Sequence, residues 1–299
     1  MTVLVVGSIA LDSVRTPHGE CSEMLGGSAT YFSLAAAHLS PVNIVAVIGE
    51  DFPEDYRKRL AARNINLDGL QIARGKTFRW AGTYAGSMNE ASTLKTELNV
   101  FEGFDPVLPD HYRTIQWVFL GNIDPELQRK VMSQITGHRL IALDTMNFWI
   151  TGHRESLLDT LKSVDLAIIN ETELKMLTGE HSIPKAAMAM TRLGPRTIVI
   201  KRGEYGCILF HEGSWFCVPA FPEPNVVDPT GAGDSFAGGF MGSLARSGSA
   251  DYLSLKRAAV MGSVMASYNI TSFGPWRLAE LQPDDIARRF TDFRDLVTL

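Results

Sequence analysis

The chain is poor in cysteine, in clustered charge and in long apolar runs. Its 299 residues include three cysteines, Cys21, Cys207 and Cys217, and no CxxC pair. This odd number without paired spacing favours reduced thiols in a cytoplasm over a disulfide framework. The formal net charge is -5 with no block of like charges, so we expect no nucleic-acid partner. No apolar run approaches the length of a membrane span, so we expect no membrane partner.

Two common nucleotide-binding motifs are missing as well. No GxxxxGK[ST] sequence occurs, which argues against a P-loop enzyme. The first apolar run, residues 3–9, contains Gly7 alone in place of GxGxxG, which disfavours an NAD-linked dehydrogenase. This run has no basic leader and no cleavage site, and Asp12 follows it closely. We therefore interpret it as a first β-strand and not as a signal peptide.

What the chain does contain is an alternation of short β-branched runs and helical patterns. The predicted strands lie at 3–9, 42–48, 115–120, 140–143, 166–169 and 197–200. The predicted helices lie at 29–39, 53–63, 125–135, 156–161, 183–193, 235–246, 252–268 and 284–296. This alternation predicts a three-layer α/β fold with a mostly parallel central sheet. Because no repeat or flexible linker interrupts it, we expect a single domain over residues 1–299.

Two segments, approximately 12–25 and 73–101, break the alternation. Within the second, short runs rich in Thr, Tyr, Phe and Val are separated by Gly86-Ser87 and Asn89-Glu90, which predicts antiparallel strands. The first is too short and too polar for a crossover helix. We expect the two insertions to form a small β-sheet lid over one edge of the main domain.

The most informative stretch is residues 228–236, which read Asp-Pro-Thr-Gly-Ala-Gly-Asp-Ser-Phe. If a helix begins near Asp234, the small residues Gly231, Ala232 and Gly233 present unpaired N–H groups at the positive end of its dipole. This arrangement predicts an anion site, most simply for phosphate. A carboxylate beside a bound anion does not help binding, so Asp234 is a candidate general base for an attacking hydroxyl. A plain glycine turn capped by Asp234 accounts for less of the run.

This stretch closely resembles the C-terminal signature of the ribokinase family, the pfkB-type carbohydrate and nucleoside kinases. The resemblance implies a ribokinase-like fold with a β-sheet lid, and transfer of the γ-phosphoryl group of ATP to a hydroxyl group in the presence of Mg2+. It assigns catalysis to Asp234 and the anion hole to the amides around Gly231, Ala232 and Gly233. It also implies a monovalent cation, K+, at Asp228.

Further residues resemble the nucleotide side of that family. Asn170 and Glu173 match its Asn-x-x-Glu motif, which orients Mg2+ waters and phosphates. From the residues alone the pair also predicts a helix cap with a capping box, and the two roles are compatible because they use different atoms.

A glycine turn and two further residues complete the predicted nucleotide site. Lys201, Gly203 and Gly206 resemble the family's Thr-x-Gly-x-x-Gly turn at the nucleotide phosphates, with Lys201 in the place of Thr. A hairpin turn with solvated charges is the alternative. The resemblance also places Thr230 at the nucleotide and Asn269 near the adenine.

The resemblance extends to the acceptor side. Gly26 and Gly27 match the N-terminal Gly-Gly motif under the substrate, and Asp12 matches the Asp that binds acceptor hydroxyls, for which an acceptor-only carboxylate is suited. Four residues after the second glycine, Tyr31 stands where the family often has Asn.

Weaker candidates lie elsewhere on the acceptor side. Asn147, in Asp144-Thr-Met-Asn147, resembles an Asp-x-Asn stretch with one extra residue. Arg79 and Trp80 of the predicted lid either touch substrate or pack across strands.

The sequence therefore predicts a cytoplasmic ATP-dependent kinase acting on a sugar or a related small molecule. A nucleoside kinase of the same family is the alternative, with aromatic residues that either stack on a base or belong to the core. These aromatic residues are Phe32, Phe78, Trp80, Phe101 and Phe148. A catalytically silent sugar or nucleotide sensor on the same fold is a second alternative. In the family such lids pair into dimers, so a homodimer through the lid is a further expectation.

Overall fold

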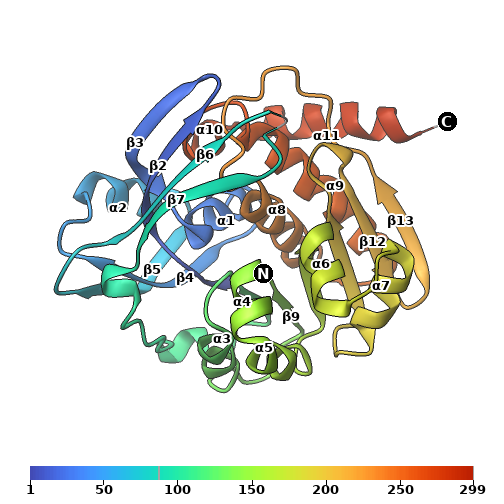
Figure 1. Ribbon diagram of the computed structural model, residues 1–299, viewed down its shortest axis with the longest axis horizontal. Helices are drawn as coiled ribbons and strands as arrows, with labels where there is room; N and C mark the ends of the chain where they lie inside the picture. The colour runs from blue at the N-terminus through green and yellow to red at the C-terminus, as the bar shows by residue number, and fades with distance from the viewer. Residues whose placement is uncertain (87, 299) are drawn as a thin grey trace.

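The computed structural model describes residues 1–86 and 88–298, and its centre is a nine-stranded sheet (Figure 1). The strand order is β13-β12-β11-β10-β9-β8-β1-β4-β5. The strands are β1 (Val3–Val6), β4 (Val42–Gly49), β5 (Ile65–Ala73), β8 (Trp117–Leu120), β9 (Leu140–Leu143), β10 (Leu166–Asn170), β11 (Thr197–Lys201), β12 (Cys207–His211) and β13 (Ser214–Val218). The strands from β5 to β11 in this order pair in parallel, whereas β12 and β13 pair antiparallel. The predicted mostly parallel sheet is confirmed.

Helices cover both faces of this sheet and give the three predicted layers (Figure 1). One face carries α1 (Ser28–Ala36), α2 (Glu54–Ala61), α8 (Ala232–Ser247), α9 (Tyr252–Asn269), α10 (Trp276–Glu280) and α11 (Pro283–Val297). The other carries α3 (Pro125–Met132), α4 (Asn147–Gly152), α5 (Arg154–Leu161), α6 (Glu171–Thr178) and α7 (Ile183–Thr191). Strand β1 shows why two cores form: Val3 and Val5 face the first helix layer, whereas Leu4 and Val6 face the second.

A second sheet of four strands stands over the edge of the main sheet beside α1 and α2 (Figure 1). Its order is β3-β2-β6-β7, with β2 (Ala10–Thr16), β3 (Gly19–Gly26), β6 (Phe78–Tyr84) and β7 (Ala91–Glu97). Strands β2 and β3 form one antiparallel hairpin, and β6 and β7 form the other. The two hairpins join through a parallel pairing of β2 with β6. The small sheet predicted from the two insertions is thus present. Ser87, in the predicted turn between β6 and β7, lies outside the described residues.

Several predicted elements differ from the structure at their ends, and some were missed. The helices predicted at 29–39, 53–63 and 125–135 end earlier, at Ala36, Ala61 and Met132, because the chain turns there. Strand β5 was not predicted because its sequence, INLDGLQIA, is polar and half exposed at the sheet edge. The short helix α4 was missed as well, since it has one buried residue and no capping side chain.

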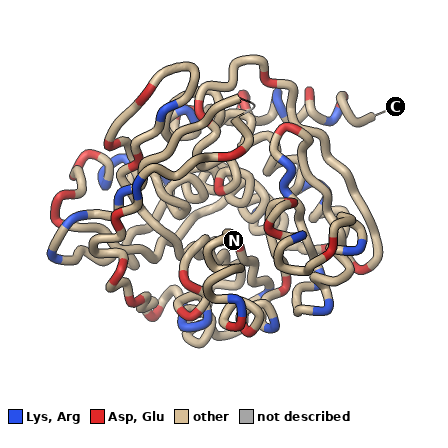
Figure 2. The backbone as a smooth tube through the Cα atoms, in the orientation of Figure 1, with Lys and Arg blue, Asp and Glu red and all other residues tan. Residues whose placement is uncertain are grey.

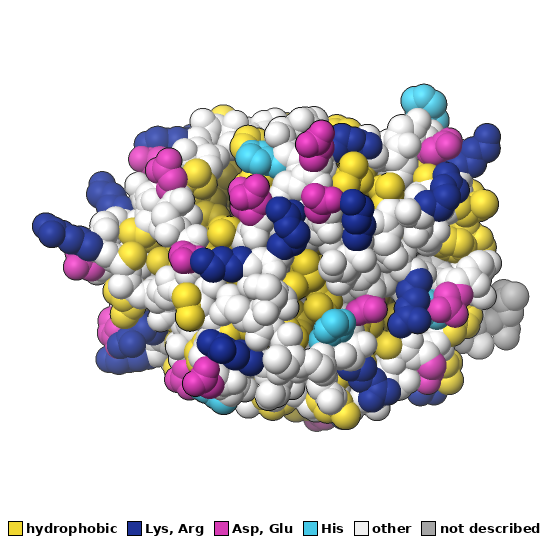
Figure 3. Space-filling view, turned by 90° about the horizontal axis from the view of Figure 1, so that it is seen from below, with side chains coloured by type: hydrophobic (Ala, Val, Ile, Leu, Met, Phe, Trp, Pro, Cys, Tyr) yellow, Lys and Arg dark blue, Asp and Glu magenta, His cyan; other side chains and the backbone are white. Residues whose placement is uncertain are grey.

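Charged side chains are mixed over the surface. Lys and Arg alternate with Asp and Glu along the chain trace (Figure 2) and over the face seen from below (Figure 3). Among the helices of the described residues, none has both the length and the apolar character needed to cross a bilayer.

Candidate active site

The predicted site residues gather where parallel strands end and α8 begins. Asp144 directly follows β9, Asn170 ends β10 and Lys201 ends β11. In the register of the sheet, Asn170 lies opposite Lys201. Ligands in α/β folds bind at the carboxyl ends of the strands, so the fold supports a site at this edge.

Helix α8 begins at a turn that requires glycine. Gly231 is its N-cap, in the left-handed conformation with φ 73°. A side chain at this position would also overlap the ring of Tyr31, which packs against the turn. Glycine therefore satisfies both the backbone angle and the close contact. Asp234 follows in the first turn of α8, where the helix dipole favours a carboxylate.

The first turn of α8 offers two amides to a ligand. The N–H of Ala232, predicted to be a free donor, donates instead to the carbonyl oxygen of Pro229 at 3.1 Å. Within the described residues, no backbone acceptor faces the N–H groups of Gly233 and Asp234. The N–H of Asp234 acts on its own carboxylate and lowers the pKa of that group in part. The candidate anion hole is formed by the N–H of Gly233 together with that of Asp234, at the positive end of a 16-residue helix.

Asp234 has the electrostatic environment of a base that works near neutral pH. The pKa of Asp234 is raised to about 7, mainly by burial and next by the charge of Asp144, while Lys201 lowers it in part. A carboxylate with this pKa is ionised in a large fraction of molecules at pH 7 and still binds a proton effectively. This is the compromise that general-base catalysis requires.

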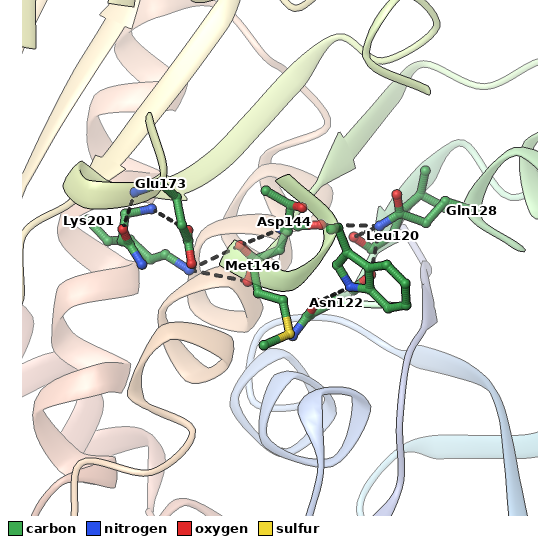
Figure 4. A network of polar contacts seen from close by, with 11 residues as sticks. Leu120, Asn122, Gln128, Asp144, Met146, Glu173 and Lys201 are labelled. Carbon is green, nitrogen blue, oxygen red and sulfur yellow. Dashed lines mark hydrogen bonds and ion pairs between the residues drawn. The ribbon is translucent and has the colours of Figure 1, made fainter. Parts of the chain in front are cut away.

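Lys201 and Asp144 form an ion pair beside this base. The Nζ atom of Lys201 lies 3.2 Å from both carboxylate oxygens of Asp144 (Figure 4). Both side chains are largely buried, at 19% and 7% exposure. Although burial lowers the pKa of Lys201, the carboxylates of Asp144, Glu173 and Asp234 raise it above its ordinary value. The ammonium is therefore charged at neutral pH.

Asn170 and Glu173 form the predicted capping box at the start of α6 (Figure 4). The N–H of Glu173 donates to Asn170 Oδ1 at 2.8 Å, and the N–H of Asn170 donates to Glu173 Oε2 at 3.0 Å. The other carboxylate oxygen of Glu173 is not used by the capping box. The pKa of Glu173 is raised to about 7, mainly by burial; the charge of Lys201 lowers it in part, and the charge of Asp144 contributes to the rise. The cap role is thus present, and one oxygen remains for a further contact.

This donor set fits Mg2+ bound through water. Among the described residues, no cluster of three or more His, Cys, Asp or Glu side chains is arranged to hold a metal ion by itself. Mg2+ keeps several waters and is bound by one or two carboxylates together with substrate phosphates. Glu173 and Asn170 offer oxygen atoms of the kind that orient such waters.

Asp12 lies against Gly26 and Gly27, near the turn that leads into α8. A Cβ atom on Gly26 would overlap its carboxylate, and Gly27 has a φ of 92° that few other residues adopt. The pKa of Asp12 is raised to about 7. Burial is the main cause, and the charges of Asp228 and Asp234 add to it, while a hydrogen bond from the N–H of Gly27 lowers the pKa in part. The predicted acceptor residues therefore lie together with the candidate base.

Two tyrosines line the same region. Tyr31 is 1% exposed, and within the described residues its hydroxyl has no hydrogen-bond partner. Burial, followed by the charges of Asp12 and Asp228, raises the pKa of Tyr31 well above its usual range. Tyr84 of β6 accepts a hydrogen bond from the hydroxyl of Thr230 at 3.4 Å. The sequence did not single out Tyr84, because nothing in a lid strand indicates which side chain reaches the catalytic turn.

Asn269 supports the turn, and its predicted place near the adenine stays a prediction. It is 1% exposed, and its Nδ2 donates to the carbonyl oxygen of Thr230 at 2.7 Å. Asp228 supports the same turn by accepting from the N–H of Thr230 at 2.9 Å and that of Gly274 at 3.4 Å. A bound K+ at Asp228 stays a prediction.

Arg79 is a structural clamp of the lid, and its predicted contact with substrate stays a prediction. Its Nε lies 2.8 Å from Glu23 of β3, and its Nη1 lies 2.8 Å from Asp51, which follows β4. Nη1 also donates to the carbonyl oxygen of Thr77. With its donors directed to these partners, Arg79 joins the lid to the main domain.

The tip of the second lid hairpin reaches the predicted nucleotide turn. Asn89 Nδ2 donates to Glu204 at 2.9 Å, and a side chain on Gly203 would meet Asn89 Oδ1 at 2.6 Å. Gly203 and Gly206 have φ values of 54° and 83°, so both positions require glycine. The lid therefore extends from Asp12 and Gly26 in its first hairpin to the turn around Gly203.

The remaining candidates separate into core and surface. Phe32 is fully buried and stacks on Phe119 at 4.5 Å, so it belongs to the core. Asn147 is exposed as the first residue of α4 and makes no side-chain hydrogen bond to the other site residues described. Its predicted contact with substrate stays a prediction.

Comparison with known proteins decides the family. The sequence model of the pfkB family carbohydrate kinases matches residues 2–279. The chain belongs to this family. A relative is the cytidine kinase of Thermococcus kodakarensis, 29% identical over 290 residues, which cover 93% of this chain and 99% of that protein.

Solved structures of pfkB-type kinases share the fold. A putative ribokinase II of E. coli, in complex with ATP and Mg2+, has a TM-score of 0.79 at 18% identity, over 97% of this chain and 99% of that one. The nucleoside kinase of Burkholderia thailandensis, in complex with ADP-inosine, has a TM-score of 0.80 at 18% identity, over 97% and 95%. The predicted ribokinase-like fold is confirmed.

As a pfkB family member, the protein is a phosphotransferase with an alcohol group as acceptor, as predicted.

Proposed function

We propose that this protein transfers the γ-phosphoryl group of ATP to a primary hydroxyl of a nucleoside, with Asp234 as general base. The nucleoside is favoured over a free sugar by the similarity to a cytidine kinase over nearly the whole of both chains. A structural neighbour in complex with ADP-inosine supports the same choice. A sugar is the second candidate, since the matching family model is that of carbohydrate kinases.

The observation that carries the proposal is the first turn of α8. Two amides without backbone acceptors and a carboxylate with a pKa of about 7 occur there within two residues, Gly233 and Asp234. In the proposed reaction Asp234 accepts the proton of the acceptor hydroxyl as its oxygen forms a bond to the γ-phosphorus. The bond from that phosphorus to the bridging oxygen breaks, and its electron pair leaves with ADP.

The anion hole acts on charge that develops during transfer. The N–H groups of Gly233 and Asp234 are fixed by the helix, so they stabilise the phosphoryl oxygens without reorganisation. Bound Mg2+ would neutralise phosphate charge, and Asn170 and Glu173 are the residues we assign to its water shell. Asp12 is assigned to the acceptor hydroxyls, where it binds and orients. A K+ ion bound at Asp228 would support the same turn.

We assign to the lid the role of excluding water from the site. Water is a competing phosphoryl acceptor, so closure over the site favours transfer to the bound alcohol. The hydrogen bond from Thr230 to Tyr84 and the contact of Asn89 with Glu204 are the places where the lid meets the catalytic and nucleotide turns. These two separate contacts support a covering role for the lid.

ADP release measured with a panel of acceptors tests this function. The panel contains cytidine, other ribonucleosides, ribose, fructose and inositol, each with ATP and Mg2+. We expect turnover with at least one ribonucleoside and weak or no turnover with the free sugars. Turnover with free sugars alone would assign the second candidate. Saturable ATP binding without ADP release for any acceptor would instead favour the silent sensor.

A further inference from the structure

The ammonium of Lys201 lies close to the first turn of α8. A Cβ atom built on Gly233 would lie 3.1 Å from its Nζ. The amine is therefore within reach of any group bound to the amides of Gly233 and Asp234. It extends from the end of β11 to Asp144 at the end of β9 (Figure 4).

Three carboxylates surround this single ammonium. Asp144 pairs with it directly, and Glu173 and Asp234 act on it through their charge. The neighbouring cation, Arg202, is bound to Glu171 of α6 at 2.8 Å. Because Arg202 is held by α6, its guanidinium does not compete for the position of the Lys201 ammonium.

The Lys201 ammonium has donors suited to a further anion. It carries three N–H donors, and Asp144 offers it two oxygen atoms, each at 3.2 Å. These distances are longer than the about 2.7–2.9 Å typical of charge-assisted hydrogen bonds. Amides, helix dipole and ammonium together match an anion of more than one negative charge.

The carboxylate that holds Lys201 is itself fixed. The N–H of Thr145 donates to Asp144 Oδ1 at 2.9 Å. Nε2 of Gln128, a residue 1% exposed, donates to the carbonyl oxygen of Asp144 at 3.1 Å and to that of Gly121 at 2.8 Å (Figure 4). Asp144 is thus held by partners other than Lys201, through its carboxylate and through its backbone carbonyl oxygen.

We propose that Lys201 is a catalytic residue that binds the transferring phosphoryl group, and that Asp144 is the residue that positions it. The inference rests on the proposed kinase function and adds to it a cation supplied by the chain itself. As charge builds on the phosphoryl oxygens, the ammonium of Lys201 exchanges one contact with Asp144 for a contact with these oxygens. Lys201 stays protonated throughout, and the acceptor proton goes to Asp234.

Four variants test the proposal. Lys201→Met removes the charge, Lys201→Arg keeps it, and Asp144→Asn removes the paired carboxylate. The double variant Lys201→Met/Asp144→Asn leaves neither buried charge unpaired, so it keeps the test open if a single variant folds poorly. Arg202→Met, a loss of the adjacent cation, is the matched control. We measure kcat, KM for ATP, thermal unfolding, and the calorimetric Kd of ADP with and without aluminium fluoride, a mimic of the transferring group.

We expect Lys201→Met to lower kcat by about 10²–10³ and to abolish the tightening of ADP binding by aluminium fluoride. The Kd of ADP alone should change by less than about threefold, since only the transferring group is contacted. Lys201→Arg should restore part of kcat. Asp144→Asn should lower kcat by about tenfold, and this effect should vanish in the Lys201→Met background, because Asp144 acts through Lys201. Arg202→Met should retain kcat within about threefold.

Two outcomes overturn the proposal. One is Lys201→Met with near-normal kcat and intact aluminium fluoride tightening. The other is an Asp144→Asn loss that adds in full to that of Lys201→Met, since this would give Asp144 an independent role. The failures are distinguishable: if Asp234→Asn is inactive while Lys201→Met is active, the kinase mechanism stands and only Lys201 is removed from it. If the wild type releases no ADP with any acceptor, both fall together.

Discussion

At the scale of single residues, the site is built from glycines and buried carboxylates that constrain one another. Gly26 makes room for the carboxylate of Asp12, and Gly231 makes room for the ring of Tyr31. Asp12 and Asp234 then lie close enough for each to raise the pKa of its neighbours. Such crowding lowers the stability of the folded protein, and it persists because the site needs the charges.

Asp12→Asn should stabilise the protein at alkaline pH. The pKa of Asp12 is about 7 in the folded protein and about 4 in an unfolded chain. The folded state binds this proton more tightly, so stability is lost as pH rises from about 4 to about 7. We expect the variant to melt a few degrees above the wild type at pH 8, with a smaller gain at pH 5.5, together with a raised acceptor KM.

Thermal unfolding followed by circular dichroism at the two pH values checks this prediction. Asp110→Asn is the control, because the side chain of Asp110 is 95% exposed, and its substitution should leave the pH dependence unchanged. If Asp12→Asn melts at the wild-type temperature at pH 8, the carboxylate is not destabilising and the crowding described here is wrong.

At the scale of elements, the lid depends on a few contacts with the main domain. The Arg79 guanidinium joins β6 to β3 and to Asp51, and the hairpin tip at Asn89 meets Glu204. Pairing of two such lids in a homodimer stays a prediction.

Arg79→Met should loosen the lid without disturbing the nucleotide site. We expect the acceptor KM to rise by about tenfold, since acceptor positioning depends on closure, while the Kd of ADP stays within about threefold. Steady-state kinetics and calorimetry measure the two quantities. Arg15→Met is the control, because its pair with Glu20 in the same sheet is exposed, at 69% and 66%, and contributes little. An equal rise in KM for both variants would remove the clamp role of Arg79.

The helices and strands also show how much of the fold can be predicted from sequence patterns. Buried parallel strands such as β9 and β10 were predicted almost to the residue, because both of their faces are apolar. The second lid hairpin was predicted from turn residues and runs rich in Thr, Tyr, Phe and Val. The first insertion was assigned to the lid because it is too short and too polar for a crossover helix. Strand β5 and helix α4 could not be found in this way, since a half-exposed edge strand and a helix of six residues leave little periodicity. The hydrogen bond of Asn269 to Thr230 was not predicted, because sequence does not show which way a residue near a helix end points.

At the scale of the whole molecule, the fold brings distant residues to one edge. The turn before α8, the capping box and Asp12 were singled out from local patterns; the capping box is confirmed, and the catalytic and acceptor-binding roles stay proposals. The pairing of Lys201 with Asp144, 57 residues apart, was not predicted, because it depends on which strands are neighbours in the sheet. The acceptor stays a proposal for a similar reason: it is bound by lid and core residues whose meeting, as with Tyr84 and Thr230, only the three-dimensional structure reveals.

The central claim is that Asp234 takes the proton of the acceptor while the amides beside it hold the transferring group. The most direct test is kcat of Asp234→Asn with the accepted nucleoside at saturation, with the Kd of ADP measured on the same preparation. We predict a fall in kcat on the order of 10²–10⁴ with the Kd of ADP changed by less than about threefold. A variant that turns over at nearly the wild-type rate would contradict the account.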